Sequence, residues 1–135
     1  MSLEAVRIAY PVLVSIAADL AQAVTDRKPP RWVSYDEFCA RCKELGIKET
    51  PRTIAARILK PLQAACLENN VPDLSAVIIQ KPRSRGDFGD LIRPSDGWWE
   101  IYEQRGEAKV GDVVFWFRRF QAARDYRDWP EAPFF

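Results

Sequence analysis

Histidine is absent from this chain of 135 residues, and the absence excludes more chemistry than any other feature of the composition. Catalytic triads that depend on an imidazole base cannot be built, and the commonest zinc ligand is missing. The chain also lacks an uninterrupted apolar run of the roughly 18 to 20 residues that span a bilayer, because polar residues break the longest one, Val12 to Val24. The first residues lack the pattern of a secretory signal. We therefore expect a soluble, cytoplasmic protein that makes no membrane contact.

Cysteine is scarce, with three residues in the chain. Cys39 and Cys42 have the spacing of a zinc knuckle, but they fall on one face of an expected helix and only Cys66 could add a third thiol. This usage fits a reducing compartment and small core side chains better than a disulfide framework or a metal site. We expect no metal and no cofactor.

Net charge is only +1, but the charges are unevenly distributed. The segment from Arg27 to Lys60 contains nine basic and four acidic residues, and the stretch from Lys81 to Arg93 adds four basic and two acidic residues. One interpretation is a basic face that contacts phosphates. The other is ordinary scatter of charge over a solvated surface, and composition alone does not separate the two.

Apolar periodicity and capping residues predict three helices in the first half of the chain. The first runs from Pro11 to Asp26, with proline at its first position. The second begins after Ser34, which forms a capping box with Glu37, and ends at Gly46. The chain then needs only a short turn before the next helix, as in a helix-turn-helix.

The third helix begins with Thr50 as its cap and Pro51 at its first position. Its apolar pattern continues to Glu68, although Pro61 lies inside it. An internal proline removes one hydrogen bond and clashes with the preceding turn, so we expect a kink or break near Lys60.

The second half is predicted to contain an antiparallel hairpin and a last helix. Leu74–Gln80 and Trp98–Tyr102 are the expected strands, joined by a basic loop that contains glycine. Asp112 can cap a carboxyl-terminal helix, and residues 127–135 form an aromatic tail that packs on the domain or on a partner. The helix should supply core side chains: Val113, Val114, Trp116, Phe117 and Phe120.

This order of elements is the outline of a winged helix-turn-helix. It predicts an α+β fold that is mainly helical, with a small β-hairpin wing, in a single domain over residues 1–135. On the third helix, an advance of about 100° per residue separates an apolar arc from a basic arc. The basic arc and the wing would contact double-stranded DNA, with Arg57 able to reach a guanine edge. The predicted DNA contacts are Arg52, Thr53, Arg57, Lys60, Lys81, Arg83 and Arg85.

The pattern resembles the winged-helix superfamily from Pro11 to Tyr126. Val33–Glu37 and Ala55–Arg57 also resemble the DNA-binding half of alkylguanine alkyltransferase-like proteins, whose recognition helix carries an arginine after small residues. The reactive Pro-Cys-His-Arg segment of that family has no counterpart, so the resemblance transfers one residue, Arg57, and no chemistry. It implies a non-catalytic DNA-binding protein, of a kind common as small regulators in phages and mobile elements.

A protein-interaction module on the same scaffold is the alternative function. Aromatic side chains are frequent anchors of protein interfaces. The expected returning strand and the tail offer several, so a protein partner or a homodimer stays open. The residues in this alternative are Trp98, Trp99, Trp129, Phe134 and Phe135.

A metal-dependent nuclease is the minor alternative. Asp96 followed by Glu107 and Lys109 imitates a Pro-Asp, Glu-x-Lys arrangement, in which carboxylates hold magnesium and a lysine lies near the phosphate. Gly106 and Gly111 flank the second part and indicate a turn rather than a buried strand. We therefore expect no enzymatic activity.

Overall fold

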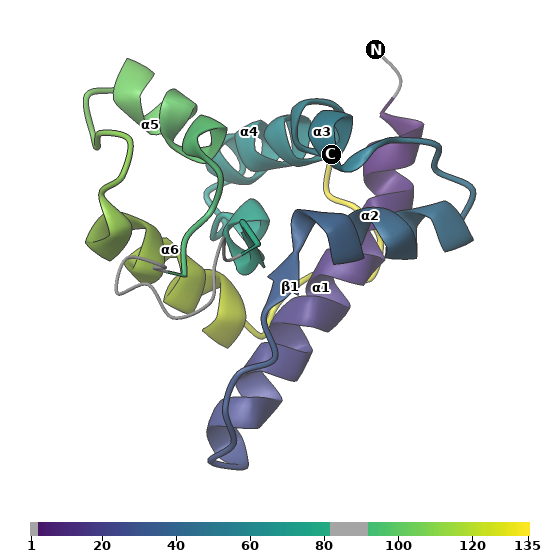
Figure 1. Ribbon diagram of the computed structural model, residues 1–135, viewed down its shortest axis with the longest axis horizontal. Helices are drawn as coiled ribbons and strands as arrows, with labels where there is room; N and C mark the ends of the chain where they lie inside the picture. Colours follow the sequence, from purple (N-terminus) through teal and green to yellow (C-terminus); the bar gives the residue numbers. More distant parts are fainter. Residues whose placement is uncertain (1–2, 82–91) are drawn as a thin grey trace.

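The computed structural model describes residues 3–81 and 92–135, which are mostly helical with a small sheet, so the α+β class is confirmed. Helix α1 runs through the molecule, with α2, α3 and α4 across one end and α5 and α6 on the other side (Figure 1). The elements are α1 (Glu4–Thr25), β1 (Val33–Ser34), α2 (Tyr35–Glu44), α3 (Pro51–Ile54), η1 (Ala55–Leu59), α4 (Lys60–Glu68), η2 (Leu74–Val77), β2 (Ile78–Ile79), η3 (Asp96–Trp99), α5 (Glu100–Gln104) and α6 (Val113–Asp125).

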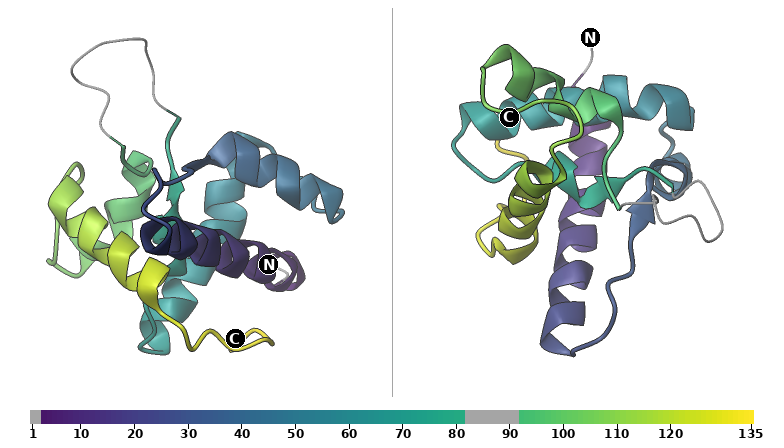
Figure 2. Two further views of the ribbon diagram at one scale, coloured as in Figure 1. Left: turned by 90° about the horizontal axis from the view of Figure 1, so that it is seen from below. Right: turned by 60° about the vertical axis from the view of Figure 1, so that its left-hand side comes forward.

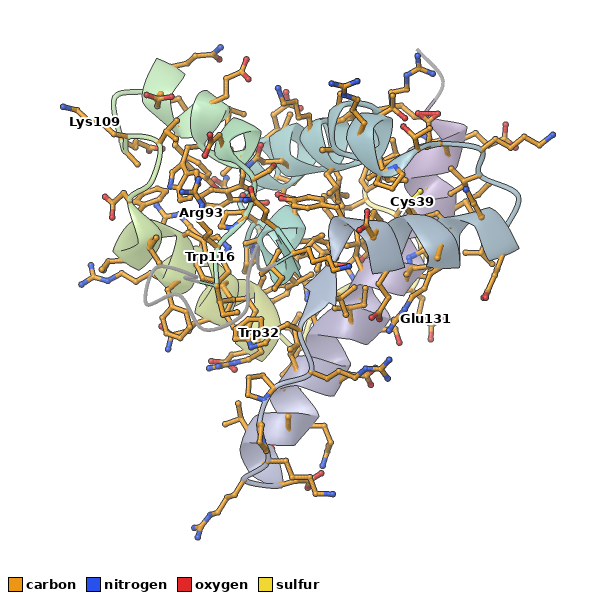
Figure 3. All side chains as sticks on the ribbon, viewed as in Figure 1. Trp32, Cys39, Arg93, Lys109, Trp116 and Glu131 are labelled. Carbon is orange, nitrogen blue, oxygen red and sulfur yellow. The ribbon has the colours of Figure 1, made fainter. Side chains whose placement is uncertain are left out.

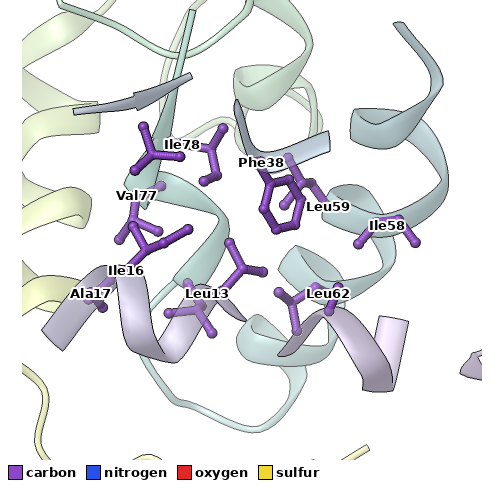
Figure 4. Close-up of a cluster of buried hydrophobic side chains, with 14 of the residues drawn as sticks. Leu13, Ile16, Ala17, Phe38, Ile58, Leu59, Leu62, Val77 and Ile78 are labelled. Carbon is purple, nitrogen blue, oxygen red and sulfur yellow. The ribbon is translucent and has the colours of Figure 1, made fainter. Parts of the chain in front are cut away.

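The core forms where α1 meets the other elements. Leu13 and Ile16 of α1 point toward Phe38 of α2 and Leu62 of α4, and Val77 of η2 closes the cluster (Figure 4). All five side chains are less than 2% exposed. The apolar faces predicted for the first three helices are therefore the faces that are buried, with two exceptions: Val24, near the end of α1, and Leu45, just after α2, are about half exposed.

Helix α1 begins at Glu4, seven residues before the predicted start, and Pro11 lies in its interior. Proline was expected at the first helical position because it lacks an N–H. The prediction was wrong because Val6, Ala9 and Tyr10 extend the buried stripe toward the amino terminus, and this burial outweighs one missing hydrogen bond.

By length and mean hydropathy alone, α1 could cross a membrane, a property that the sequence analysis did not anticipate. Core helices of globular proteins can pass the same test. Here the helix packs against η1, η2 and α6, and its buried stripe runs from Val6 to Ala21.

The predicted caps of α2 and α3 are present. Ser34 accepts a hydrogen bond from the Glu37 backbone N–H at 3.2 Å, but the Glu37 carboxylate accepts from Arg41 instead of completing the box. Gly46, with φ of +87°, ends the turn after α2. A left-handed backbone at this position favours glycine, so the sequence signal had a direct structural cause.

Pro61 does not break the third helix. Residues 51–68 stay helical, and the turn immediately before the proline, η1, widens so that the Lys60 backbone N–H donates to the Ala55 carbonyl. A π-turn adds room and changes the pairing where proline cannot donate. The predicted break is therefore a bulge within a continuous helical segment.

The sheet differs from the predicted hairpin. In the described part of the chain it has two strands, which pair in parallel, with Val33 beside Ile78 and Ser34 beside Ile79. The first half of the expected strand, Leu74–Val77, is instead a 3-10 turn. Asp73 caps this turn by accepting from the Ser75 N–H, which explains why a segment with a buried, β-branched composition does not extend fully.

The second expected strand, Trp98–Tyr102, is helical, and this part of the prediction was wrong. The aromatic content suggested a strand, but positions 98 and 102 are one helical turn apart. The Trp98 and Tyr102 ring centroids lie 4.9 Å apart, and both side chains are buried. Burial of the aromatic face on a helix thus outweighs β propensity.

A buried carboxylate connects η2, η3, α4 and α5. Asp73 Oδ1 accepts hydrogen bonds from the backbone and hydroxyl of Ser75, and Oδ2 accepts from the Tyr102 hydroxyl at 2.6 Å and the Gln63 amide at 3.0 Å. The Gln63 amide also donates to the Trp98 carbonyl. Burial and the adjacent Asp73 raise the pKa of Tyr102, so its hydroxyl keeps the proton that it donates.

Helix α6 begins at the predicted cap, where Asp112 accepts from the Phe115 N–H. Trp116 and Phe120 are buried as predicted, but Val114 and Phe117 are exposed and do not supply the core. The inner face packs on α1 and η2, which leaves the opposite side of α6 uncovered in the described structure.

The aromatic tail lies along α1 (Figure 2). The rings of Trp129, Phe134 and Phe135 meet Tyr10 edge to face, with centroids 5.8 to 6.4 Å apart. The Tyr10 hydroxyl donates to the Pro130 carbonyl at 2.8 Å. One tyrosine of α1 therefore holds most of the tail.

Replacement of Tyr102 by phenylalanine should destabilise the fold. It removes one donor from the buried Asp73 carboxylate, and hydrogen bonds to charged groups contribute about 1.5 to 3 kcal/mol. Urea denaturation should show a decrease of that size in the free energy of unfolding. Tyr126→Phe is the matched control, because the Tyr126 hydroxyl makes no hydrogen bond with the described residues. Equal losses in the two variants would contradict the role of Asp73.

Alkaline pH should weaken the packing around Tyr10. Burial, with smaller contributions from Cys66 and Tyr126, raises the pKa of Tyr10 from 10.0 to about 12. The unfolded chain therefore loses the Tyr10 hydroxyl proton at a lower pH than the folded chain. The stabilisation that the protonated Tyr10 gives the fold is complete below pH 10 and is lost as pH rises toward 12. The free energy of unfolding should fall less steeply above pH 10 in Tyr10→Phe than in the wild type. An unchanged alkaline slope would contradict this.

Candidate nucleic-acid interface

The outward face of α3 and η1 carries cations above an apolar inner face. Ile54, Ile58 and Leu59 are at most 5% exposed, whereas the side chain of Arg57 is 66% exposed and that of Lys60 is 44% exposed. Arg52 and Ala56 are also on the exposed side. Helical periodicity therefore separated the two arcs correctly.

Thr53 has a capping role that the sequence analysis missed. Its hydroxyl accepts from the Thr50 N–H at 3.0 Å, and the Thr50 hydroxyl accepts from the Thr53 N–H at 3.2 Å. This reciprocal pair satisfies two donors at the start of α3. The Thr53 hydroxyl, predicted to hold a phosphate, is thus already bound within the helix cap.

Two acids lie beside the predicted DNA contacts. Arg57 Nε is 3.5 Å from a Glu49 carboxylate oxygen, and Lys60 Nζ is 2.7 Å from Glu100. The Lys60 ammonium lowers the pKa of Glu100 through the hydrogen bond and through charge attraction. Glu49 could have been noticed from its position just before the helix. Glu100 lies 40 residues from Lys60, in a segment expected to be a strand, so no local signal pointed to it.

Arg52 and Lys81 come together at one groove. The groove has a volume of about 370 Å³ and lies between the first turns of α2 and α3 and the residues on either side of segment 82–91. A backbone hydrogen bond of 2.7 Å from Gln80 to Arg93 closes the base of that segment. Arg83 and Arg85 lie outside the described residues. The groove is lined by Tyr35, Asp36, Pro51, Arg52, Ala55, Gln80, Lys81 and Ser95.

Hydrogen bonds fix one wall of the groove. Ser95 donates from its backbone N–H at 3.0 Å to the Tyr35 hydroxyl, which also lies 3.2 Å from the Ser95 hydroxyl. Burial raises the pKa of Tyr35 even though both bonds to Ser95 oppose the shift. The chain that follows segment 82–91 is therefore attached to the first turn of α2. It packs beside the helix that carries the cations.

Trp98 and Trp99, two of the residues expected to form a protein-interaction surface, are buried. Trp98 is 5% exposed and Trp99 is 0% exposed, and their indole N–H groups donate to the Ser75 hydroxyl and the Asp112 carbonyl. Both side chains belong to the core, so the prediction that they form an exposed contact was wrong. Trp129, Phe134 and Phe135 are half-buried in the contact with α1.

The metal-dependent nuclease alternative requires side chains that are placed to hold a metal ion. In residues 3–81 and 92–135, no group of three or more Cys, Asp or Glu side chains is placed to hold a metal ion. The cysteines are buried and unpaired, and burial raises the pKa of Cys42 to about 11 and of Cys66 to about 12. Asp96 pairs with Arg93, and Glu107 lies 3.6 Å from Arg105.

No protein-family model matches the chain, and comparison with curated proteins and with solved structures gave no match. Functional inference therefore depends on the geometry of the chain itself.

Proposed function

We propose that this chain binds double-stranded DNA without catalysis, in the manner of a winged helix-turn-helix protein. The exposed face of α3 and η1 would lie against the duplex, and segment 82–91 would act as the wing. A small regulator from a phage or mobile element is the biological role that agrees with the resemblance in the sequence.

The arrangement of Arg52 and Lys81 is the observation that supports the proposal most strongly. These residues come from separate parts of the chain and line the same groove. Neither forms an ion pair within the described residues, so both cations are available to phosphate oxygens. Among the described residues that line the groove, Asp36 is the one acid, so these residues carry a positive balance.

Arg57 and Lys60 would bind although each lies beside an acid. The Lys60–Glu100 pair is exposed on both sides, with side chains 44% and 57% exposed, and exposed ion pairs contribute little net free energy. A DNA phosphate can therefore replace Glu100. The Glu49 side chain is only 12% exposed, so Arg57 would contact a phosphate while Glu49 stays beside it. The acids lower the affinity for any single phosphate, a property that would limit non-specific binding.

Removal of both groove cations should weaken duplex binding. In Arg52→Ala/Lys81→Ala, affinity should fall at least about tenfold at low salt, and the slope of log K against log salt should decrease by about 2. Fluorescence anisotropy with a random-sequence duplex at several salt concentrations measures both quantities.

Lys28→Ala/Lys109→Ala is the matched control. Both lysines are exposed, neither has an ion-pair partner in the described part of the chain, and Lys109 projects from the α5–α6 side of the molecule (Figure 3). The control removes the same net charge and should change affinity much less. Absence of duplex binding by the wild type at low salt, or equal losses in the two double variants, would disprove the proposal.

Removal of the Glu100 charge should strengthen duplex binding. Glu100→Gln releases Lys60 from its ion pair, and we expect affinity to rise roughly two- to fivefold. Glu103→Gln removes an equal charge from the same helix, but Glu103 has no ion-pair partner among the described residues, so the gain should be smaller. Equal gains in the two variants would show a general charge effect and no specific competition by Glu100.

A further inference from the structure

A second groove lies at the amino-terminal end of α1. It has a volume of about 480 Å³ and is bounded by the first two turns of α1, the turn between α2 and α3, and η1 (Figure 1). No residue is common to it and to the groove of Arg52 and Lys81. This groove is called the second groove below. Its volume is in the range of small-molecule sites, and its lining combines aliphatic side chains with charges of both signs.

Isoleucines form the apolar part of the second groove. Ile47 and Ile58 line it and are at most 5% exposed, so they form its floor. Ile8 of α1 also lines it and is 37% exposed. An aliphatic ligand would therefore remove apolar surface from water when it packs on Ile8.

One carboxylate oxygen of Glu49, which lines the groove, accepts no hydrogen bond. Glu49 Oε1 is shielded from solvent, and no group in the described part of the chain donates to it. Arg57 Nε lies 3.5 Å away, close enough for an ion pair but without a hydrogen bond. A buried carboxylate oxygen without a donor costs free energy, so a ligand that brings an N–H group would remove this cost.

The charges of the second groove complement a zwitterion. Glu49 and Arg57 place opposite charges 3.5 Å apart, and Glu4 and Lys48 add one charge of each sign. A simple cation would be repelled by Arg57, and a simple anion would be repelled by Glu49. An α-amino acid carries an ammonium and a carboxylate on one carbon, so it offers a partner to each residue. The Arg57 side chain is 66% exposed and can turn toward the ligand carboxylate, which leaves room for the ammonium at Glu49.

We propose that the second groove binds a zwitterionic α-amino acid with an aliphatic side chain. Its ammonium donates to the Glu49 carboxylate, its carboxylate accepts from the Arg57 guanidinium, and its side chain packs on Ile8. Each of the three parts of the ligand thus has a partner in the lining of the groove. The proposal does not depend on DNA binding.

Isothermal titration calorimetry of the full chain with leucine tests the site. Leucine should bind saturably, with one site per chain. Leucinamide lacks the carboxylate, isocaproate lacks the ammonium, and glycine lacks the aliphatic side chain. Each should bind at least about tenfold more weakly than leucine, because one of the three contacts is missing. These comparisons use the unaltered protein, so they do not depend on how a variant folds.

Two variants locate the binding in the second groove. Glu49→Gln and Arg57→Gln should each weaken leucine binding at least about tenfold. Arg57 is an exposed residue of a helical segment, so Arg57→Gln should keep the native circular dichroism spectrum. Glu44→Gln and Arg52→Gln are the matched controls. Both residues are exposed, neither lines the second groove or forms an ion pair within the described structure, and both controls should bind leucine like the wild type.

The absence of saturable leucine binding would overturn the proposal. Equal affinity for leucine and isocaproate would also overturn it, because Glu49 would then take no part, and so would equal affinity for leucine and glycine. Equal losses in Glu49→Gln and Glu44→Gln would place the binding elsewhere and contradict the assignment. A chain that binds duplex DNA but not leucine would leave the proposed function intact, so the two failures can be told apart.

Discussion

The buried carboxylate of Asp73 holds the helical segments in their arrangement. Its hydrogen bonds come from the backbone and side chain of Ser75, from Gln63 of α4 and from Tyr102 of α5. A buried carboxylate without these donors would be very costly, so the elements that supply them must stay together. Trp98 joins the same network, and the chain between Ser95 and Trp98 is thereby placed against the helix that carries the basic side chains.

The proposed function follows from this packing. The wall formed by Tyr35 and Ser95 places the base of segment 82–91 beside the start of α3, and Arg52 and Lys81 then share one groove. Glu100 is carried on the helix that Tyr102 anchors, so the same network also positions an acid against Lys60. In our account, one set of core hydrogen bonds thus determines both where the cations gather and how strongly an internal acid competes for them.

Local signals in the sequence predicted local structure well. Ser34, Thr50 and Asp112 cap helices as expected because a cap needs only the few residues that follow it. Long-range partners decided the rest. The segment that begins at Trp98 is helical because the helix buries Trp98 against Ser75 and Tyr102. The Lys60–Glu100 ion pair joins two segments that lie close together only because this segment is a helix. Helical periodicity identified the basic face but could not reveal the acids beside it.

The central claim is that a duplex contacts the chain at the groove cations. Its most direct test is an NMR titration of isotopically labelled protein with a short duplex at low salt. We predict that the largest chemical-shift changes occur at Arg52, Arg57, Lys60 and Lys81, while the amides of α6 stay unchanged. Changes confined to α6 or to the aromatic tail, or the absence of any change at low salt, would contradict the account.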